Sequence, residues 1–112
     1  TTIIMRRTPR MLKQFEVETQ VTMSNDPVMQ RTVLEITAAD RPGLLARMGA
    51  IFAEFGAQMQ GAKILTEGER VSDIFYIVDE NGQPFSDADR CEDLQEAIIM
   101  GLDEQVEAQS AV

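Results

Sequence analysis

The chain has 112 residues, the length of one domain or of one domain with a tail. Its hydrophobic fraction of 44% and charged fraction of 26% are those of an ordinary globular protein. Nineteen acidic against ten basic side chains give a net charge of -9, so neither nucleic acid nor an anionic membrane surface is expected as a partner. No apolar run approaches the ~20 residues of a spanning helix, and no signal peptide is predicted.

The residue types that carry much of enzyme chemistry are scarce. The chain has no histidine, which excludes a Ser/His or Cys/His nucleophile pair and any site with a histidine metal ligand. Its single cysteine, Cys91, has no internal disulfide partner, which fits a reducing cytoplasm. Carboxylates remain as candidates for acid–base work or magnesium binding, so composition alone leaves acidic catalysis open. Because the chain begins with Thr1, we expect it to be a piece of a longer protein.

Charge is unevenly distributed along the chain. Residues 1–31 carry a net charge of +2, and residues 32–112 carry -11. We interpret residues 1–14 as a basic linker or docking arm, in which a solvated connector is the simpler of the two readings. Its basic side chains are Arg6, Arg7, Arg10 and Lys13.

Two strands are predicted first. From Phe15 to Met23 apolar and polar residues alternate, which is typical of a half-buried strand, and Ser24-Asn25-Asp26-Pro27 ends it. A second alternation at Thr32–Ala38 predicts a strand that pairs with the first, because the intervening loop is short.

A helix is predicted next. Asp40-Arg41-Pro42-Gly43 predicts its start, with Asp40 as N-cap and Pro42 in the first turn. The helix is predicted to run to about Phe55 and to stop at Gly56. Its apolar stripe comprises Leu44, Leu45, Met48, Ile51, Phe52 and Phe55. Its small residues, which would let it lie close to a sheet, are Ala46, Gly49, Ala50 and Ala53.

A β-hairpin follows the helix. Its strands are Gln58–Thr66, with a bulge expected at Gly61, and Val71–Asp79, joined by a turn at residues 67–70. The second of these strands is apolar on both faces and is therefore expected to be covered on both. One face carries Val71, Phe75 and Ile77, and the other carries Ile74, Tyr76 and Val78.

The last predicted element is a second helix. Ser86 is its expected cap, with Asp89 three residues further on. Its apolar stripe comprises Cys91, Leu94, Ile98, Leu102 and Val106. Residues 107–112 are expected to form a frayed tail, so that residues 15–106 make up the domain.

The order strand, strand, helix, strand, strand, helix predicts an α+β protein with a ferredoxin-like architecture. Such a domain is an antiparallel four-stranded sheet with two helices on one face. The usual order is βαββαβ, whereas no strand is predicted after the second helix. A strand at residues 15–23, paired beside Thr32–Ala38, would fill the vacant edge, so the predicted domain is a permuted β-βαββα version.

One stretch of the chain resembles a known family. The run Asp40-Arg41-Pro42-Gly43-Leu44-Leu45, followed by the helix and hairpin, is similar to an ACT domain, the small-molecule-sensing module of amino-acid metabolism. Residues 32–84 resemble more narrowly the last ACT domain of the bifunctional uridylyltransferase/uridylyl-removing enzymes, which modify the PII nitrogen-signalling protein. The turn Gly68-Glu69-Arg70-Val71 with Asp73-Ile74-Phe75 carries this narrower match. Gln60 is a departure, because relatives often carry histidine there.

The resemblance implies a regulatory role. In that family nucleotidyltransferase and metal-dependent phosphohydrolase domains precede the ACT pair, so this fragment would be the glutamine-sensing end, without catalytic residues. It would need no cofactor, whereas the parent enzyme would use a divalent metal such as Mg²⁺. The implied partners are glutamine or another amino acid, a second ACT domain or a second copy of the chain, and the PII protein through the parent enzyme. In the intact enzyme, residues 15–23 would close either this domain or the preceding one.

The strand-to-helix turn is the predicted ligand site. The backbone N–H groups of Gly43, Leu44 and Leu45, at a helix N-terminus, suit a carboxylate. Asp40 or its neighbour suits the ammonium group of an amino acid. Simple capping of the helix is the alternative explanation of the same residues.

Four further positions are candidates, and three of them carry two interpretations each. Arg41 would contact either the ligand or an acidic neighbour on the surface. Gln58 and Met59 would line the pocket at the start of the third strand, unless Met59 belongs to the core. Asp73 is either a buried polar anchor or a contact with a second domain.

The open face of the sheet is the predicted interface. Ile74, Tyr76 and Val78 predict that it meets another copy or another ACT domain, and the alternative is that the N-terminal arm crosses it. Two other functions stay open: an association module that binds nothing at the turn, and an ACT domain of a different amino-acid enzyme.

Overall fold

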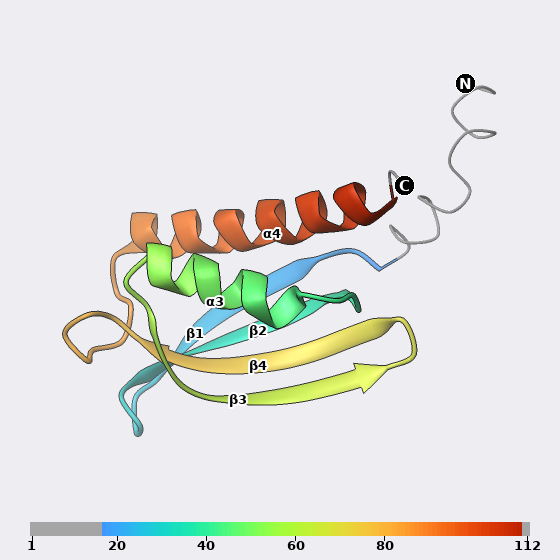
Figure 1. The fold of residues 1–112 in the computed structure, drawn as a ribbon. Coiled ribbons are helices and arrows are strands. Elements are labelled where there is room, and N and C mark those ends of the chain that lie inside the picture. Colours follow the sequence, from blue (N-terminus) through green and yellow to red (C-terminus); the bar gives the residue numbers. More distant parts are fainter. Residues whose placement is uncertain (1–16, 111–112) are drawn as a thin grey trace.

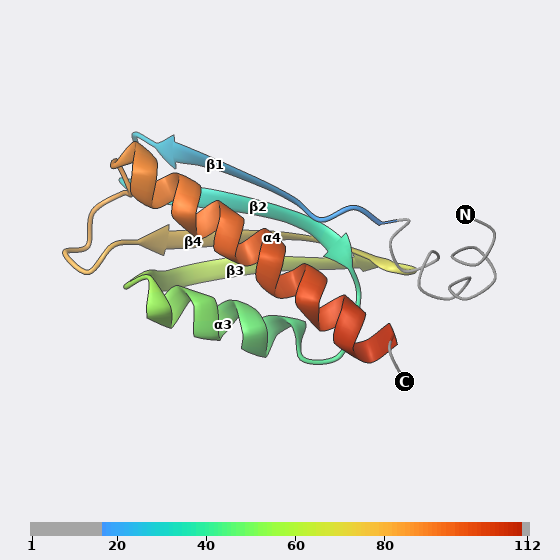
Figure 2. The same ribbon diagram turned by 90° about the horizontal axis from the view of Figure 1, so that it is seen from above.

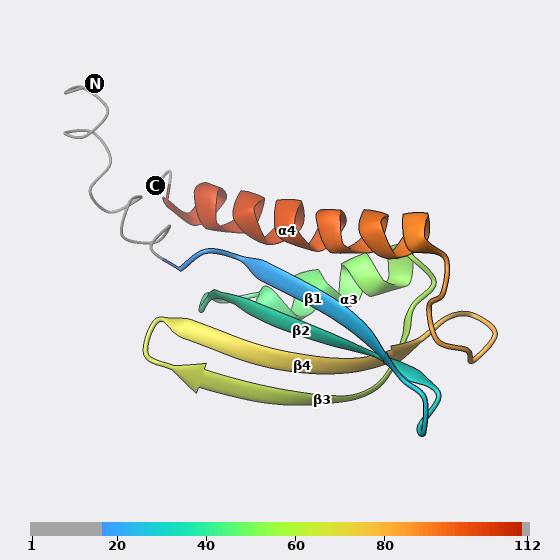
Figure 3. The same cartoon turned by 180° about the vertical axis from the view of Figure 1, so that it is seen from behind.

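A computed structural model describes residues 17–110, so the arm predicted at residues 1–14 lies outside the described residues. The elements are β1 (Gln20–Asp26), β2 (Arg31–Ala39), α3 (Leu44–Glu54), β3 (Gln58–Glu67), β4 (Arg70–Val78) and α4 (Ala88–Ser110). The strands form one antiparallel sheet in the order β1-β2-β4-β3. Both helices lie on the same face of it, as Figures 1 and 3 show. The predicted ferredoxin-like α+β fold, in its permuted order, is confirmed.

The first strand takes the edge position beside β2, as predicted. Val21 and Met23 pack against the core from this strand. The strand does not end at Met23, however, but continues through the residues predicted to break it as far as Asp26. The break comes at Asp26 because its Oδ1 accepts hydrogen bonds from the backbone N–H groups of Val28 (2.9 Å) and Met29 (3.2 Å), which closes the turn to β2. Phe15, the predicted start, lies outside the described residues.

The start of α3 differs from the prediction. Its N-cap is Gly43, in the left-handed conformation with φ 81°, and not Asp40. The backbone N–H of Asp40 instead donates to the carbonyl of Glu69 in the hairpin turn (2.8 Å). The helix begins at Leu44, after Pro42 rather than around it, so Asp40 lies too far before the first helical turn to cap it. The predicted stop at Gly56 is confirmed, with φ 68°.

Both ends of α4 also differ from the prediction. Asp87 caps the helix instead of Ser86, because its Oδ1 accepts from the N–H of Asp89 (3.0 Å) and its carbonyl accepts from the N–H of Cys91 (3.0 Å). The helix then continues through Ser110, so residues 107–110, predicted as a frayed tail, are helical.

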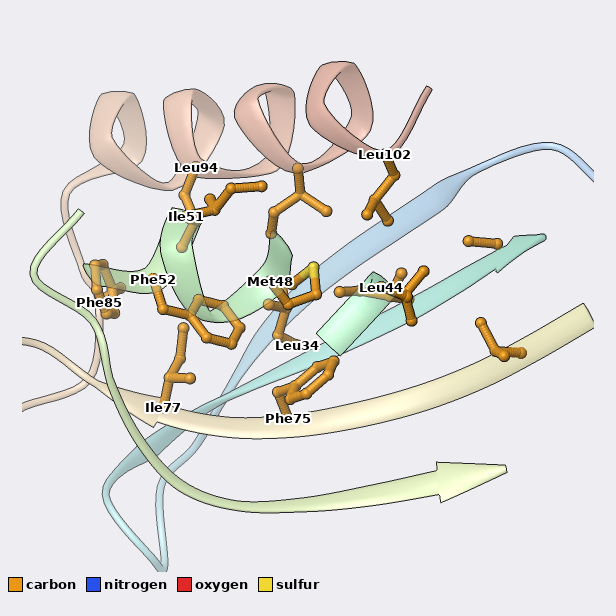
Figure 4. Packing of buried hydrophobic residues seen from close by; sticks show 14 residues of the cluster. Leu34, Leu44, Met48, Ile51, Phe52, Phe75, Ile77, Phe85, Leu94 and Leu102 are labelled. Carbon is orange, nitrogen blue, oxygen red and sulfur yellow. The ribbon is translucent and has the colours of Figure 1, made fainter. Parts of the chain in front are cut away.

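The core lies between the helices and the sheet. Figure 2 shows α4 crossing above the sheet diagonally, with α3 beside it. In Figure 4, Met48 and Phe52 of α3 lie above Phe75 and Ile77 of β4, and the rings of Phe52 and Phe75 pack edge to face with centroids 5.4 Å apart. The predicted stripe of α4 is confirmed: Leu94, Ile98 and Leu102 are fully buried, Val106 is buried, and Cys91 is half-buried.

The small residues of α3 do not face the sheet, contrary to the prediction. Ala46, Gly49, Ala50 and Ala53 are all exposed, and so is Leu45. Close approach of the two helices occurs instead at Gly101 of α4, where an added Cβ would lie 3.0 Å from Cδ1 of Ile51. The larger side chains of α3 take the inward positions because burying them removes more apolar surface from water.

The hairpin forms as predicted, and its first strand, β3, is the other edge strand of the sheet. Gly68, with φ 63°, supplies the tight turn between Glu67 and Arg70. The predicted bulge is present, because the register shifts between Met59 and Gly61. Three large apolar side chains of β3 are about half exposed: Met59, Ile64 and Leu65.

Candidate functional site

A pocket of about 280 Å³ lies where β2 passes into α3. Five residues predicted from the sequence line it, namely Asp40, Arg41, Gly43, Leu44 and Leu45. Five more were not predicted to line it: Ala46, Ile64, Thr66, Val71 and Asp73. The pocket is therefore built by the loop of residues 40–43, the first turn of α3 and the paired ends of β3 and β4.

Strand register brings these segments together. Ala39, the last residue of β2, pairs with Arg70, the first residue of β4. The hairpin turn is thereby placed against the loop, where the hydrogen bond from Asp40 to Glu69 holds it. From β3, Ile64 and Thr66 pair with Asp73 and Val71 of β4 and share their face. The alternation of β3 near its hairpin is the signal that could have identified Ile64 and Thr66.

The start of α3 gives one wall of the pocket a positive character. Gly43 has no side chain, and no side chain caps the N–H groups of the first helical turn in the described part of the chain. Such uncapped N–H groups, together with the positive end of the helix dipole, attract an anion. From α4, Gln105 Nε2 donates to the carbonyl of Pro42 (3.4 Å) and supports the loop from outside. This wall suits a carboxylate.

Asp73 gives the opposite wall a negative character. It lies on the helix-covered face of β4 between Val71 and Phe75, and its side chain is only 1% exposed. Its Oδ1 accepts a hydrogen bond from the N–H of Leu65 (3.3 Å), whereas its Oδ2 is buried and has no partner within residues 17–110. Burial raises the pKa of the Asp73 carboxyl, the bond from Leu65 lowers it, and the nearby carboxylate of Asp40 raises it.

Arg41 is not on the surface, where the sequence had placed it as one alternative. Its residue exposure is 7%, and its three guanidinium nitrogens have no hydrogen-bond partner within the described residues. Burial lowers its pKa, while the negative charges of Asp103 and Asp40 raise it. Asp103 of α4 is therefore close enough to Arg41 for their charges to interact. Its Oδ1 also accepts a hydrogen bond from the hydroxyl of Thr19 (2.9 Å).

Gln58 and Met59 do not line this pocket, and that prediction is wrong. Gln58 pairs with Val78, at the opposite end of β4 from the hairpin turn. Its Nε2 donates to the carbonyl of Asp79 (3.0 Å), and Met59 is 56% exposed. The reason is the antiparallel direction of β3, which begins near the C-terminus of α3 and only later reaches its N-terminus.

One known protein family matches the part of the chain that builds this pocket. The family model described as ACT domain matches residues 32–84, from β2 through the hairpin and into the following loop. Residues 32–84 are therefore an ACT domain.

The relatives of this ACT domain chain are long enzymes. It is 57% identical over 101 residues to a bifunctional uridylyltransferase/uridylyl-removing enzyme of Pseudomonas putida. The matched region is 90% of the chain and 11% of that enzyme. An enzyme of the same name from Pseudomonas fluorescens is 56% identical over 90% of the chain and 11% of its own length. The enzyme from Ectopseudomonas mendocina is 54% identical over 92% of the chain and 12% of its own length. The chain therefore spans about a ninth of the relatives it matches. No solved structure matches it significantly.

The open face of the sheet carries the predicted interface residues unevenly. Ile74 and Tyr76 are half-buried there, and the guanidinium of Arg31 lies over the Tyr76 ring, 3.9 Å from its centroid. Val78 is only 3% exposed, at the point where β4 passes into the turn of residues 79–83, so it offers no surface to a partner. Along the described residues, no helix is long and apolar enough to cross a membrane.

Replacing Asp73 by asparagine is expected to stabilise the ACT domain at neutral pH. Because the pKa of Asp73 is raised on folding, the folded state binds its proton more tightly, and the wild type loses stability as pH rises through the raised value. Asparagine keeps an acceptor for the N–H of Leu65 and carries no charge. We expect Asp73→Asn to raise the free energy of unfolding by about 1 kcal/mol at pH 7.

Urea denaturation of both proteins from pH 3 to pH 7 measures this difference. The gain should shrink as pH falls toward the ordinary pKa of an aspartate, because Asp73 is then protonated in the wild type. Asp93→Asn, at an exposed position of α4, is the matched control and should change stability by less than about 0.5 kcal/mol. A loss of stability in Asp73→Asn at pH 7 would show that the carboxylate anchors the fold.

Proposed function

We propose that this ACT domain is the glutamine-sensing regulatory part of a bifunctional uridylyltransferase/uridylyl-removing enzyme. The observation that supports this most directly is the pocket at the β2–α3 connection, where the uncapped first turn of α3 offers N–H groups to a carboxylate. In this proposal the domain carries no catalytic residue. The name of the relatives supplies the parent activity, which the longer protein would perform in the cytoplasm.

Regulation requires that glutamine bind one arrangement of the enzyme more tightly than another. Equal affinity for both arrangements would shift no equilibrium. In the proposal, glutamine binds between this domain and a second ACT domain or copy and shifts the parent enzyme between transferring uridylyl groups to the PII protein and removing them. The half-exposed Ile64, which lines the pocket and belongs to the edge strand β3, supports a site that a neighbour completes.

The expected affinity is modest. Glutamine has about ten non-hydrogen atoms, and at roughly 0.4 kcal/mol for each atom the binding free energy is ~4 kcal/mol, or a Kd near 1 mM. A pocket of about 280 Å³ is of a size for a metabolite rather than for a nucleotide. Weak binding is what a sensor of an abundant metabolite needs.

An NMR titration that resolves each backbone amide tests the proposal. We expect glutamine to cause saturable shifts at residues 40–46, 64 and 66, while glutamate, serine and branched-chain amino acids do not. Saturable shifts caused by another amino acid would indicate that the domain senses that amino acid and belongs to a different enzyme. If no amino acid shifts this chain or the longer protein with the neighbouring ACT domain, the sensing proposal is wrong.

A second function, pure association, is favoured by one observation. The edge strand β3 exposes Met59, Ile64 and Leu65, and an unpaired apolar edge is a template for another chain. A mass that rises with concentration in sedimentation experiments, with no response to any amino acid, would support association alone.

A further inference from the structure

Asp73 has an oxygen that the fold does not use. The residue is 99% buried on the face of β4 that otherwise carries Val71, Phe75 and Ile77. One carboxylate oxygen accepts the N–H of Leu65, and the other has no partner within residues 17–110. A buried polar atom without a partner costs folding free energy, so a residue kept only as an anchor is expected to have both oxygens bonded.

Within residues 17–110, no basic side chain forms an ion pair or a hydrogen bond with this carboxylate. Among the described residues, the carboxylate of Asp40, which lines the same pocket, raises the pKa of Asp73 further. The buried guanidinium of Arg41 is influenced instead by Asp103 and Asp40. Asp73 and Asp40 therefore bring two carboxylates to a pocket that Arg41 also lines, and Asp73 Oδ2 is an acceptor without a partner in the described part of the chain.

The opposite wall has the reverse polarity. There the uncapped N–H groups of the first turn of α3 and the left-handed Gly43 line the same pocket of about 280 Å³. A single small ligand that satisfies both walls must carry a positive and a negative group a few bonds apart. An α-amino acid does so with its ammonium and carboxylate groups.

We propose that Asp73 is the ammonium-binding residue of this pocket, and that the pocket selects free α-amino acids over acids that lack the α-amino group. The ammonium donates to Asp73 Oδ2, and the α-carboxylate accepts from the N–H groups at the start of α3. This inference rests on the proposed function in one respect only, that the pocket binds an amino acid. It places the ammonium on a different residue from the loop carboxylate Asp40 that the sequence suggested.

The test compares two ligands on two proteins. The ligands are L-glutamine and glutaramic acid, which is glutamine without its α-amino group; the proteins are the wild type and Asp73→Asn, each titrated by NMR. We expect the wild type to bind glutaramic acid at least tenfold more weakly than glutamine. We expect Asp73→Asn to lose at least tenfold in affinity for glutamine while its affinity for glutaramic acid stays within twofold of the wild type.

Three further proteins sharpen the comparison. Asp73→Glu keeps the charge and should regain part of the preference for glutamine. Asp40→Asn should weaken glutamine by less than Asp73→Asn, because its carboxylate is exposed. Glu35→Gln, exposed on the other face of the sheet, is the matched control and should bind like the wild type.

Each outcome decides one proposal. If the wild type binds glutamine and Asp73→Asn binds it equally well, or if Asp73→Asn weakens both ligands to the same extent, the role given to Asp73 is wrong and glutamine sensing stands. If the wild type binds no amino acid, alone or in the longer protein, both proposals fail.

Discussion

Shortening Ile98 to alanine is expected to lower the free energy of unfolding by about 4 kcal/mol. Ile98 is 0% exposed at the middle of α4, between Leu94 and Leu102 in the buried cluster. Removing its methyl and methylene groups loses the free energy gained by burying them, and it leaves a cavity that the packed helix and sheet close only in part. For a small domain such a loss consumes a large part of the total stability.

Met100→Ala is the matched control on the same helix. Met100 is 57% exposed on the outer face of α4, so its truncation should change the free energy of unfolding by less than about 0.5 kcal/mol. Urea denaturation followed by circular dichroism measures both values. If Ile98→Ala were to cost less than about 1 kcal/mol, α4 would not be docked on the sheet as described.

Replacing Gly56 by alanine is expected to cost about 2 kcal/mol. Gly56 ends α3 with φ 68°, a conformation in which a side chain is strained. An added Cβ would also lie 2.5 Å from Oε2 of Glu80 and 3.1 Å from Nη2 of Arg90. Arg90 Nη2 donates to the carbonyl of Phe55 (2.7 Å), so the new methyl group would disturb the bond that satisfies the end of the helix.

Gly68→Ala separates the two causes of that loss. Gly68 has nearly the same backbone angle, φ 63°, but nothing lies within 4 Å of the position that its Cβ would take. It should therefore show the backbone strain alone, about 1 kcal/mol. Thermal melts of the two variants measure the difference. Equal losses would mean that the contacts around Arg90 contribute nothing to the end of α3.

The stability predicted for Asp73→Asn bears directly on the binding argument. A polar anchor and a ligand-binding carboxylate are equally buried, but their replacement has opposite consequences. Removal of an anchor destabilises the fold, whereas removal of a buried charge with an unused oxygen stabilises it. If Asp73→Asn is more stable and binds glutamine less well, the carboxylate lowers the stability of the fold and is kept because it binds the ligand.

The sequence by itself determined the elements, their order and most of the side chains that fill the core. Alternation of period two identified the strands, and the spacing of Leu94, Ile98 and Leu102 identified the buried face of α4. Both signals are local, because the backbone repeats of strand and helix are fixed by the chain itself. The sequence offered the N-terminal strand for the vacant edge of the sheet but left open whether it closes this domain or the preceding one, and the structure pairs it with β2.

The tertiary structure alone decided which residues of the hairpin join the predicted loop in the pocket. Asp40 is not the cap because the helix begins only after Gly43, and its backbone N–H bonds instead to Glu69 in the hairpin turn, 29 residues further along the chain. Met59 moved away from the site, and Ile64 entered it, because the direction and register of β3 determine which end of that strand meets α3. Asp73 Oδ2 lacks a hydrogen-bond partner within residues 17–110 because the fold places no donor near it. Such facts arise from long-range pairing, which no local pattern of residues encodes.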